Sequence, residues 1–137
     1  MAHNYTDIQL ALDTQVQTVV GLPTIQLENT QNSNKNKSTW TRTTLLPAST
    51  EIVTLGAQGY DRLNGLYRID LFSQLNEGVT DASTMADLVL ASFTKGARLT
   101  SGSVVVVIEN KTRSAARVLD NRYNIPLTII WSSYQVQ

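Results

Sequence analysis

The chain has 137 residues, a length that suits one domain with a single hydrophobic core. Hydrophobic residues make up 42% of it, which argues against disorder, and eleven basic residues against eleven acidic ones exclude nucleic-acid binding through overall charge. Only 16% of the residues are charged, so we expect much of the surface to be neutral and polar or covered by other subunits.

The sequence contains no cysteine, which removes disulfides, thiolate nucleophiles and thiolate metal sites. No apolar run approaches the roughly twenty residues that a membrane helix needs. The start, MAHNYTDIQ, has neither a basic n-region nor an apolar h-region, so we expect no signal peptide. These features predict a soluble protein made and used in a cytoplasm, without a membrane partner.

The first predicted element is a helix that begins at the capping box Thr6-Asp7-Ile8-Gln9. Gly21 and Pro23 are expected to end it. Its apolar residues recur at helical spacing and form one stripe, made of Ile8, Ala11, Leu12, Val16 and Val19. Leu10 lies off this stripe, where a lone exposed leucine is normal and a partner contact is the less favoured alternative.

Two strands are predicted next, at residues 23–28 and 40–46, joined by the polar run NTQNSNKNKS at residues 29–38. The run has no apolar anchor and cannot bury itself, so we expect a hairpin with a long polar arm. Loops of this length are usually functional or disordered. Residues 47–59 are predicted to be a connector that contains a short strand at 51–55.

The stretch GLYRIDLF at residues 65–72 predicts a strand with one apolar and one mixed face. After a break at residues 76–78, a second helix is predicted from Thr80 or Asp81, with Gly96 at its C′ position. Its apolar stripe consists of Ala82, Met85, Ala86, Val89 and Phe93. Phe72 and Phe93 are expected to enter the same core.

Residues 104–108, VVVVI, predict a central strand that is buried on both faces. A last strand alternates at residues 125–131, with Pro126 at its beginning. The pattern predicts one α+β domain over residues 1–137, in which two helices pack on a mostly antiparallel sheet of about six strands.

The residues that enzymes use are scarce in this sequence. His3 is the only histidine, which excludes a catalytic triad and a histidine metal cluster. Asp81 and Asp87 are six residues apart on one helix and do not share a face. Lys95-Gly96 follows a helix and lacks the glycine spacing of a phosphate loop. We therefore predict no enzyme, cofactor or metal site, but a module that works through contact.

Basic residues gather in residues 109–122, among them Lys111, Arg113, Arg117 and Arg122. They could touch phosphates, although a solvated and partly paired connector is the favoured alternative. Trp40 and Trp131 are expected in the core or an interface, since no basic residues alternate with aromatic ones as in a base-stacking surface.

The order of these elements resembles the phage tail terminator proteins of long-tailed, non-contractile phages. The resemblance rests on the amino-terminal helix, the long polar arm closing at Leu46-Pro47, and the Gly-Leu-Tyr strand that starts at Gly65. It continues through a helix with Ala86-Asp87 near its middle and Phe93-Thr94-Lys95-Gly96 at its end, to the final Pro126-Leu127-Thr128-Ile129 strand. No single motif is specific, and order and spacing carry the likeness over nearly the whole chain.

The resemblance implies a structural virion protein at the tail–head junction, assembled in the host cytoplasm. In that family six subunits form a ring that caps the tail tube, stops its growth and joins the tail to the head connector. The implied partners are further copies of the chain, the tail tube protein and a head connector or head completion protein. DNA would pass through the lumen without specific binding. The alternatives are another neck, head–tail joining or tube subunit, or a small-ligand-binding or enzymatic α+β domain.

Candidate contact residues are predicted on physical grounds alone. The arm supplies Asn34, Lys35, Asn36 and Lys37, which have no local core to order them. Arg68 and Asp70 lie on one strand face and can pair with a neighbouring subunit. The basic segment supplies Arg113, Arg117 and Arg122, at a density that suits a partner's acidic rim better than a DNA clamp.

Overall fold

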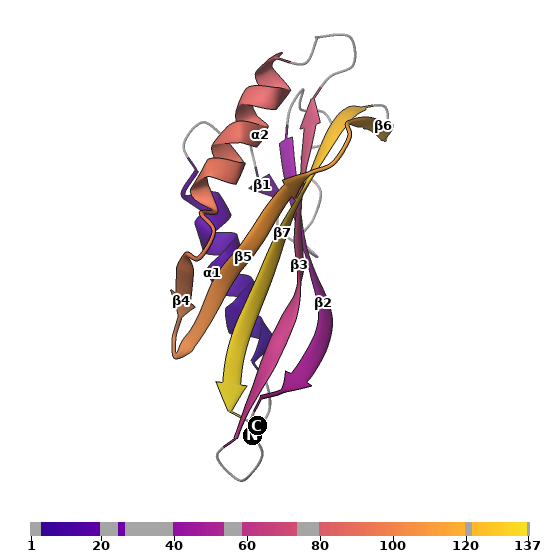
Figure 1. Ribbon diagram of the computed structural model, residues 1–137. Helices are drawn as coiled ribbons and strands as arrows, with labels where there is room; N and C mark the ends of the chain where they lie inside the picture. The colour runs from indigo at the N-terminus through magenta and orange to yellow at the C-terminus, as the bar shows by residue number, and fades with distance from the viewer. Residues whose placement is uncertain are drawn as a thin grey trace.

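A computed structural model describes residues 4–19, 25–26, 40–53, 59–73, 80–119 and 122–136 of the chain. Two helices and seven strands are found in this part of the chain, and both helices lie on the same side of one twisted sheet (Figure 1). In chain order the elements are α1 (Tyr5–Gln17), β1 (Ile25–Gln26), β2 (Trp40–Ile52), β3 (Tyr60–Ser73), α2 (Thr80–Ser92), β4 (Arg98–Ser101), β5 (Val104–Arg113), β6 (Arg117–Leu119) and β7 (Arg122–Val136).

The strands follow the order β1-β2-β3-β7-β5-β4, and β6 pairs with the beginning of β7. Every described pairing is antiparallel except that of β1 with β2. The predicted α+β class, with two helices on a mostly antiparallel sheet, is confirmed. The sequence pattern suggested about six strands and did not reveal β4 and β6, which have only 4 and 3 residues.

The core lies between the sheet and the helices, and the predicted apolar stripes fill it. In α1 the buried residues include Ile8, Ala11, Leu12 and Val16, and in α2 the stripe buries Ala82, Ala86 and Val89. Alternate residues of the long central strands meet them from the sheet, namely Tyr67, Ile69 and Leu71 of β3 and Ile125, Leu127, Ile129 and Trp131 of β7. Burial of these side chains, at about 25 cal/mol per Å² of apolar surface, is the main force that attaches the helices to the sheet.

The first helix begins two residues before the predicted capping box. Asn4 is its N-cap, and the Asn4 side-chain oxygen accepts a hydrogen bond of 2.9 Å from the Asp7 backbone N–H. The Asp7 carboxylate in turn accepts from the Asn4 amide at 2.6 Å, so Asn4 is the better-satisfied cap, and the expectation for Thr6 is wrong. The helix also ends at Gln17, ahead of the predicted Gly21.

The pairing of β1 with β2 corrects the predicted hairpin. Ile25 lies beside Thr41 and Gln26 beside Arg42 in a parallel register, whereas a hairpin requires antiparallel strands. The intervening residues 27–39 are long enough for the crossover that parallel strands need. The predicted arm at residues 29–38, with Asn34, Lys35, Asn36 and Lys37, lies outside the described residues.

Strand β2 continues through Pro47, where a connector was expected. The register between β2 and β3 shifts between Pro47 and Ser49, which marks a β-bulge. Proline is tolerated there because β1 pairs only with residues 41–42 of β2, so at Pro47 the described β2 has a single neighbouring strand. Beside the bulge, Gly65 of β3 allows β2 and the Trp131 ring to approach closely.

Two further expectations are wrong. Strand β5 has β4 and β7 as neighbours, but it buries Val104, Val106 and Ile108 on one face while its alternate residues are partly exposed, so the expected burial on both faces is wrong. Phe72 is buried, but it stacks on Trp40 on the face away from the helices, whereas Phe93 lies in the main core. Strict alternation along β3 places Phe72 opposite Leu71, and this separates it from Phe93.

Candidate interaction surface

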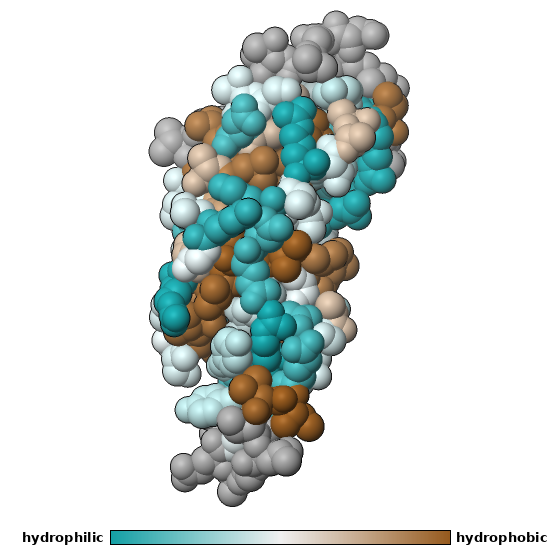
Figure 2. Space-filling view, viewed as in Figure 1, coloured by the Kyte–Doolittle hydropathy of each residue, from teal (hydrophilic) through white to brown (hydrophobic). Residues whose placement is uncertain are grey.

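The sheet has one face covered by the helices, and we call the opposite one the outer face. The outer face is exposed at Leu46 and Leu66 but buried at Trp40 and Phe72. Its residues are the ones that alternate with the core positions of β2, β3 and β7. The strand register aligns them in rows, of which Trp40–Phe72–Asn124 and Leu46–Leu66–Ile130 are two. Figure 2 shows hydrophilic side chains running down the molecule with apolar groups among them, so the exposed surface is chemically mixed.

A buried carboxylate organises one end of the outer face. Asp70 is only 1% exposed, and its carboxylate lies 3.3 Å from the Arg42 guanidinium and 3.8 Å from the Arg68 guanidinium. Arg42 also lies over the Phe72 ring, 5.1 Å from its centroid, and Phe72 stacks on Trp40 with ring centroids 4.2 Å apart. Asp70 therefore positions two arginines on an aromatic support.

The predicted contact residues of the basic segment separate onto two sides of the sheet. Arg117 pairs with Asn124 across β6 and β7 and donates to its side-chain oxygen at 3.0 Å, which places it on the outer face. Arg122 shares this face by alternation with Asn124. Arg113 instead donates to Ser83 of α2 at 3.0 Å, and Lys111 bonds to the Leu90 backbone oxygen of the same helix. The segment is thus not one connector, because much of it belongs to β5, β6 and β7.

The side chains described at this end of the outer face carry more positive than negative charge. Arg42 and Arg68 lie beside the Asp70 carboxylate, and Arg117 and Arg122 share the same face. We call this group the arginine end. A surface of this charge favours a partner that presents carboxylates or phosphates.

An apolar row crosses the middle of the outer face. Leu46 of β2 is 40% exposed and lies beside Leu66 of β3, which is 38% exposed and lies beside Ile130 of β7. Single exposed leucines are common, but side chains aligned across adjacent strands form a continuous apolar strip. Burying this strip against a partner would be favourable.

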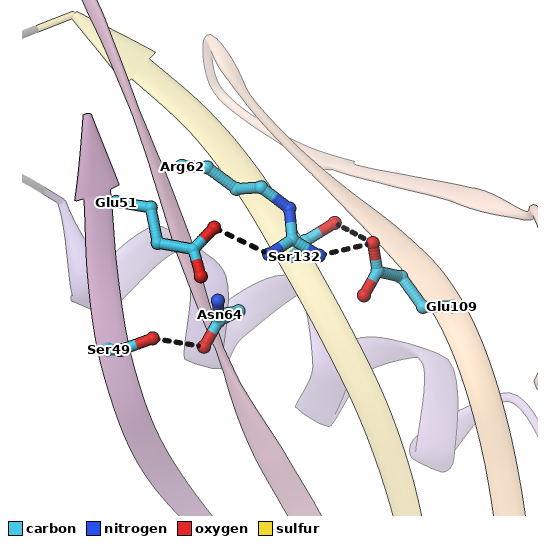
Figure 3. Close-up of polar contacts among 6 residues, drawn as sticks. All are labelled: Ser49, Glu51, Arg62, Asn64, Glu109 and Ser132. Carbon is cyan, nitrogen blue, oxygen red and sulfur yellow. Dashed lines mark hydrogen bonds and ion pairs between the residues drawn. The ribbon is translucent and has the colours of Figure 1, made fainter. Parts of the chain in front are cut away.

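An ionic cluster occupies the outer face beyond the apolar row (Figure 3). Arg62 of β3 lies 2.6 Å from the Glu109 carboxylate of β5 and 3.3 Å from the Glu51 carboxylate of β2, and Ser132 of β7 donates to Glu109 at 3.1 Å. The hydrogen bond to Arg62 lowers the pKa of the Glu109 carboxyl, and the same bond raises the pKa of Arg62. The cluster links four strands through side chains, so it braces this part of the sheet.

The outward surface of the two helices is poor in charge. In α1 the exposed positions are Thr6, Leu10, Thr14 and Gln17, and in α2 they include Thr84, Asp87, Leu88 and Ala91. Asp87 is the one charged residue among these exposed side chains of the described helices. Solvated helix faces usually carry charges of both signs, so this surface differs from an ordinary solvent-facing one.

In the part of the chain that the structure describes, no three His, Cys, Asp or Glu residues are placed to hold a metal ion. Neither α1 nor α2 has the length and apolar character of a membrane-crossing helix.

Sequence reasoning proposed Arg68, Asp70, Arg117 and Arg122 as contact residues, and the structure places all of them on the outer face or just beneath it. It missed Arg42, Arg62 and Leu46. The alternation within residues 40–46 was a usable signal for Arg42 and Leu46, since both lie on the same face of the strand as Trp40.

Comparison with known proteins is informative at the level of the family. The family profile described as phage tail terminator protein matches residues 7–131. Eleven chains among solved structures also match. One of them superposes with a TM-score of 0.72 at 16% sequence identity, over 98% of this chain and 97% of that chain, which establishes a shared fold.

No curated protein matches the chain. The profile nevertheless spans most of the sequence, and it confirms the resemblance found from the order of the elements. The chain belongs to the phage tail terminator family, whose members are structural, non-enzymatic proteins of the virion tail.

Proposed function

We propose that this chain forms a homohexameric ring that caps the phage tail tube, stops its growth and joins the tail to the head connector. Membership of the tail terminator family over residues 7–131 carries the proposal. The surface is compatible with this proposal, since it combines the apolar row, the arginine end and the low-charge outward surface of α1 and α2, which we call the helix layer. A subunit with different exposed patches can form a heterologous contact, which closes into a ring when the rotation allows.

In this proposal residues 1–137 act as one domain with several partners. These are its own copies, the tail tube protein and a head connector or head completion protein, while DNA passes through the lumen without specific binding. The ring would sit at the tail–head junction of the virion after assembly in the host cytoplasm.

The arginine end contributes to a subunit or partner contact. Arg68 and Arg117 present guanidinium groups to the outside, whereas Asp70 holds Arg42 and Arg68 from beneath. Arg122 lies on the same face. Arg113 bonds the end of β5 to Ser83 of α2. In this proposal it therefore belongs to the contact that α1 and α2 make with a partner.

The arm at residues 29–38 is proposed to meet another subunit or the tail tube. Ordering such a segment costs about 1–2 kcal/mol per residue, and Asn34, Lys35, Asn36 and Lys37 have no apolar neighbours in sequence to offset this. A partner surface can supply the compensating contacts. Deletion of residues 31–37 should weaken tail binding and leave the fold intact, and tails that still terminate normally would exclude a role for the arm.

Tail length tests the function directly. Tails should be imaged from a phage whose gene for this chain carries an early stop codon, with and without the wild-type chain supplied in trans. We expect tubes of irregular, excessive length that fail to join heads, and regular tails once the chain is supplied. Tubes of normal length that still fail to join heads would identify a head–tail joining protein instead.

Charge reversal at Arg117 tests the contact role of the arginine end. Loss of one interfacial charge pair costs about 2 kcal/mol, so Arg117→Glu should reduce binding to tails or heads roughly thirtyfold. Lys95→Glu is the matched control, because Lys95 is exposed in the turn after α2, away from the outer face. Both variants should keep the thermal stability of the wild type. Unfolding of Arg117→Glu alone would show a structural role, and normal assembly with blocked DNA ejection would move the residue to the lumen.

A further inference from the structure

Exposed apolar side chains lie on both sides of the sheet. On the outer face, Leu46 and Leu66 are paired across β2 and β3. On the opposite side, Leu88 projects from α2 and is 42% exposed, next to Asp87. A two-fold contact needs one self-complementary patch, whereas a head-to-tail contact needs two different ones. The described surface includes two such different patches, the Leu46–Leu66 pair and the surface around Leu88.

The two surfaces are chemically suited to each other. The helix surface offers leucine, threonine, alanine and glutamine side chains with Asp87 as its described charge, so covering it requires little desolvation. The middle of the outer face offers the apolar row and, next to it, Thr44 and Thr128 on either side of Arg68. The arginine end adds positive charge that Asp87 can meet.

We propose that the helix layer of one copy packs on the outer sheet face of the next copy, with Leu88 against the Leu46–Leu66 row. This contact rests on the proposed ring and specifies how it is built. Each subunit would use about 800 Å² for each of its two contacts, which is the usual size for a stable interface. The two contacts together would cover roughly a fifth of the 7494 Å² that the chain exposes, so both fit on one subunit.

The absence of cysteine makes disulfide trapping a clean test. Leu66→Cys and Leu88→Cys place thiols on opposite sides of the sheet, so these two thiols cannot join within one copy. Tails carrying the double variant should be treated with a mild oxidant and separated without reductant. We expect a ladder of covalent oligomers that ends at the ring. Tails carrying either single variant should give no cross-linked product.

The control pair combines Leu88→Cys with Val118→Cys, because Val118 is 66% exposed on β6 and lies outside both the two helices and the Leu46–Leu66 row. It should give no ladder. A disulfide between two Leu66→Cys copies would show sheet-to-sheet contact and overturn the inference. A ring of normal mass on tails without any cross-link would also overturn it, while leaving the proposed function standing. Only the absence of a ring on tails would contradict both the proposed subunit contact and the proposed function.

A second variant avoids reliance on oxidation. Leu88→Asn should lower the association constant of the copies at least tenfold, since it places an amide in the apolar contact. Val118→Asn should leave association unchanged. Equal association of Leu88→Asn and wild type would exclude the helix layer from the interface.

Discussion

The substitution Gly65→Ala tests the close approach of β2, β3 and the Trp131 ring on the core side of the sheet. A Cβ atom at Gly65 would lie 2.5 Å from the Leu46 backbone oxygen, 2.9 Å from the Pro47 Cα and 2.9 Å from the Trp131 ring. Two of these atoms belong to the backbone of β2, and the ring is fully buried, so no flexible side chain can move aside. The strand itself would have to shift.

Overpacking of this kind costs about 1–3 kcal/mol, and the conformational gain of alanine over glycine in a strand returns about 0.5–1 kcal/mol. The steric term dominates because contacts this short are outside what Cβ atoms tolerate. We therefore expect the free energy of unfolding to fall by about 1–2 kcal/mol, measured as a lower urea midpoint at unchanged m-value.

Gly96→Ala provides the matched comparison. Gly96 has φ of +81° with nothing within 4 Å of its added Cβ, so its cost of about 1 kcal/mol comes from the backbone alone. Asparagine tolerates this conformation, so Gly96→Asn should be nearly neutral while Gly65→Asn should be worse than Gly65→Ala. Wild-type stability of Gly65→Ala would refute the reasoning about the close approach of β2, β3 and Trp131.

Three further outcomes are expected. Tyr67→Phe removes the hydroxyl that donates to the buried Asp13 carboxylate of α1, and the unfolding free energy should fall by about 1–3 kcal/mol in denaturant titrations. Glu109→Gln should make the folding stability depend less on pH in the acid range. The folded pKa of Glu109 is depressed, so its contribution is present above the ordinary value of 4.5 and is lost as pH falls through the folded pKa, as thermal melts from pH 3 to pH 7 would show. Arg42→Met leaves Asp70 buried with the more distant Arg68 at 3.8 Å, so stability should fall more than in Arg68→Met, and equal losses would contradict the assigned roles.

The periodic elements could be predicted from sequence because burial on one side produces the periodicity. The α1 stripe from Ile8 to Val16 and the alternation along residues 66–72 are of this kind. Local signals failed where tertiary contacts decide the outcome. Pro47 suggested a connector, but the bulge keeps it within a strand, at a point where the described β2 pairs only with β3. The parallel pairing of β1 with β2 depends on a distant register that no local pattern encodes.

The same limit applies to the outer face. Alternation placed Arg68 and Asp70 on one face, but the partner of Asp70 is Arg42 of the adjacent strand, and only the β2–β3 register shows this. A shift of one residue would have sent Arg42 to the core side. Likewise, Arg62 and Glu109 are far apart in sequence and meet because β3 and β5 both flank β7.

Counting the copies of this chain on assembled tails tests the central claim most directly. Native mass measurement of isolated tails, or symmetry analysis of electron micrographs of their head-proximal end, gives the number without any substitution. The proposed function predicts six copies in one closed ring at the head-proximal end of the tube. A stable two-fold dimer or a single copy at that position would contradict it.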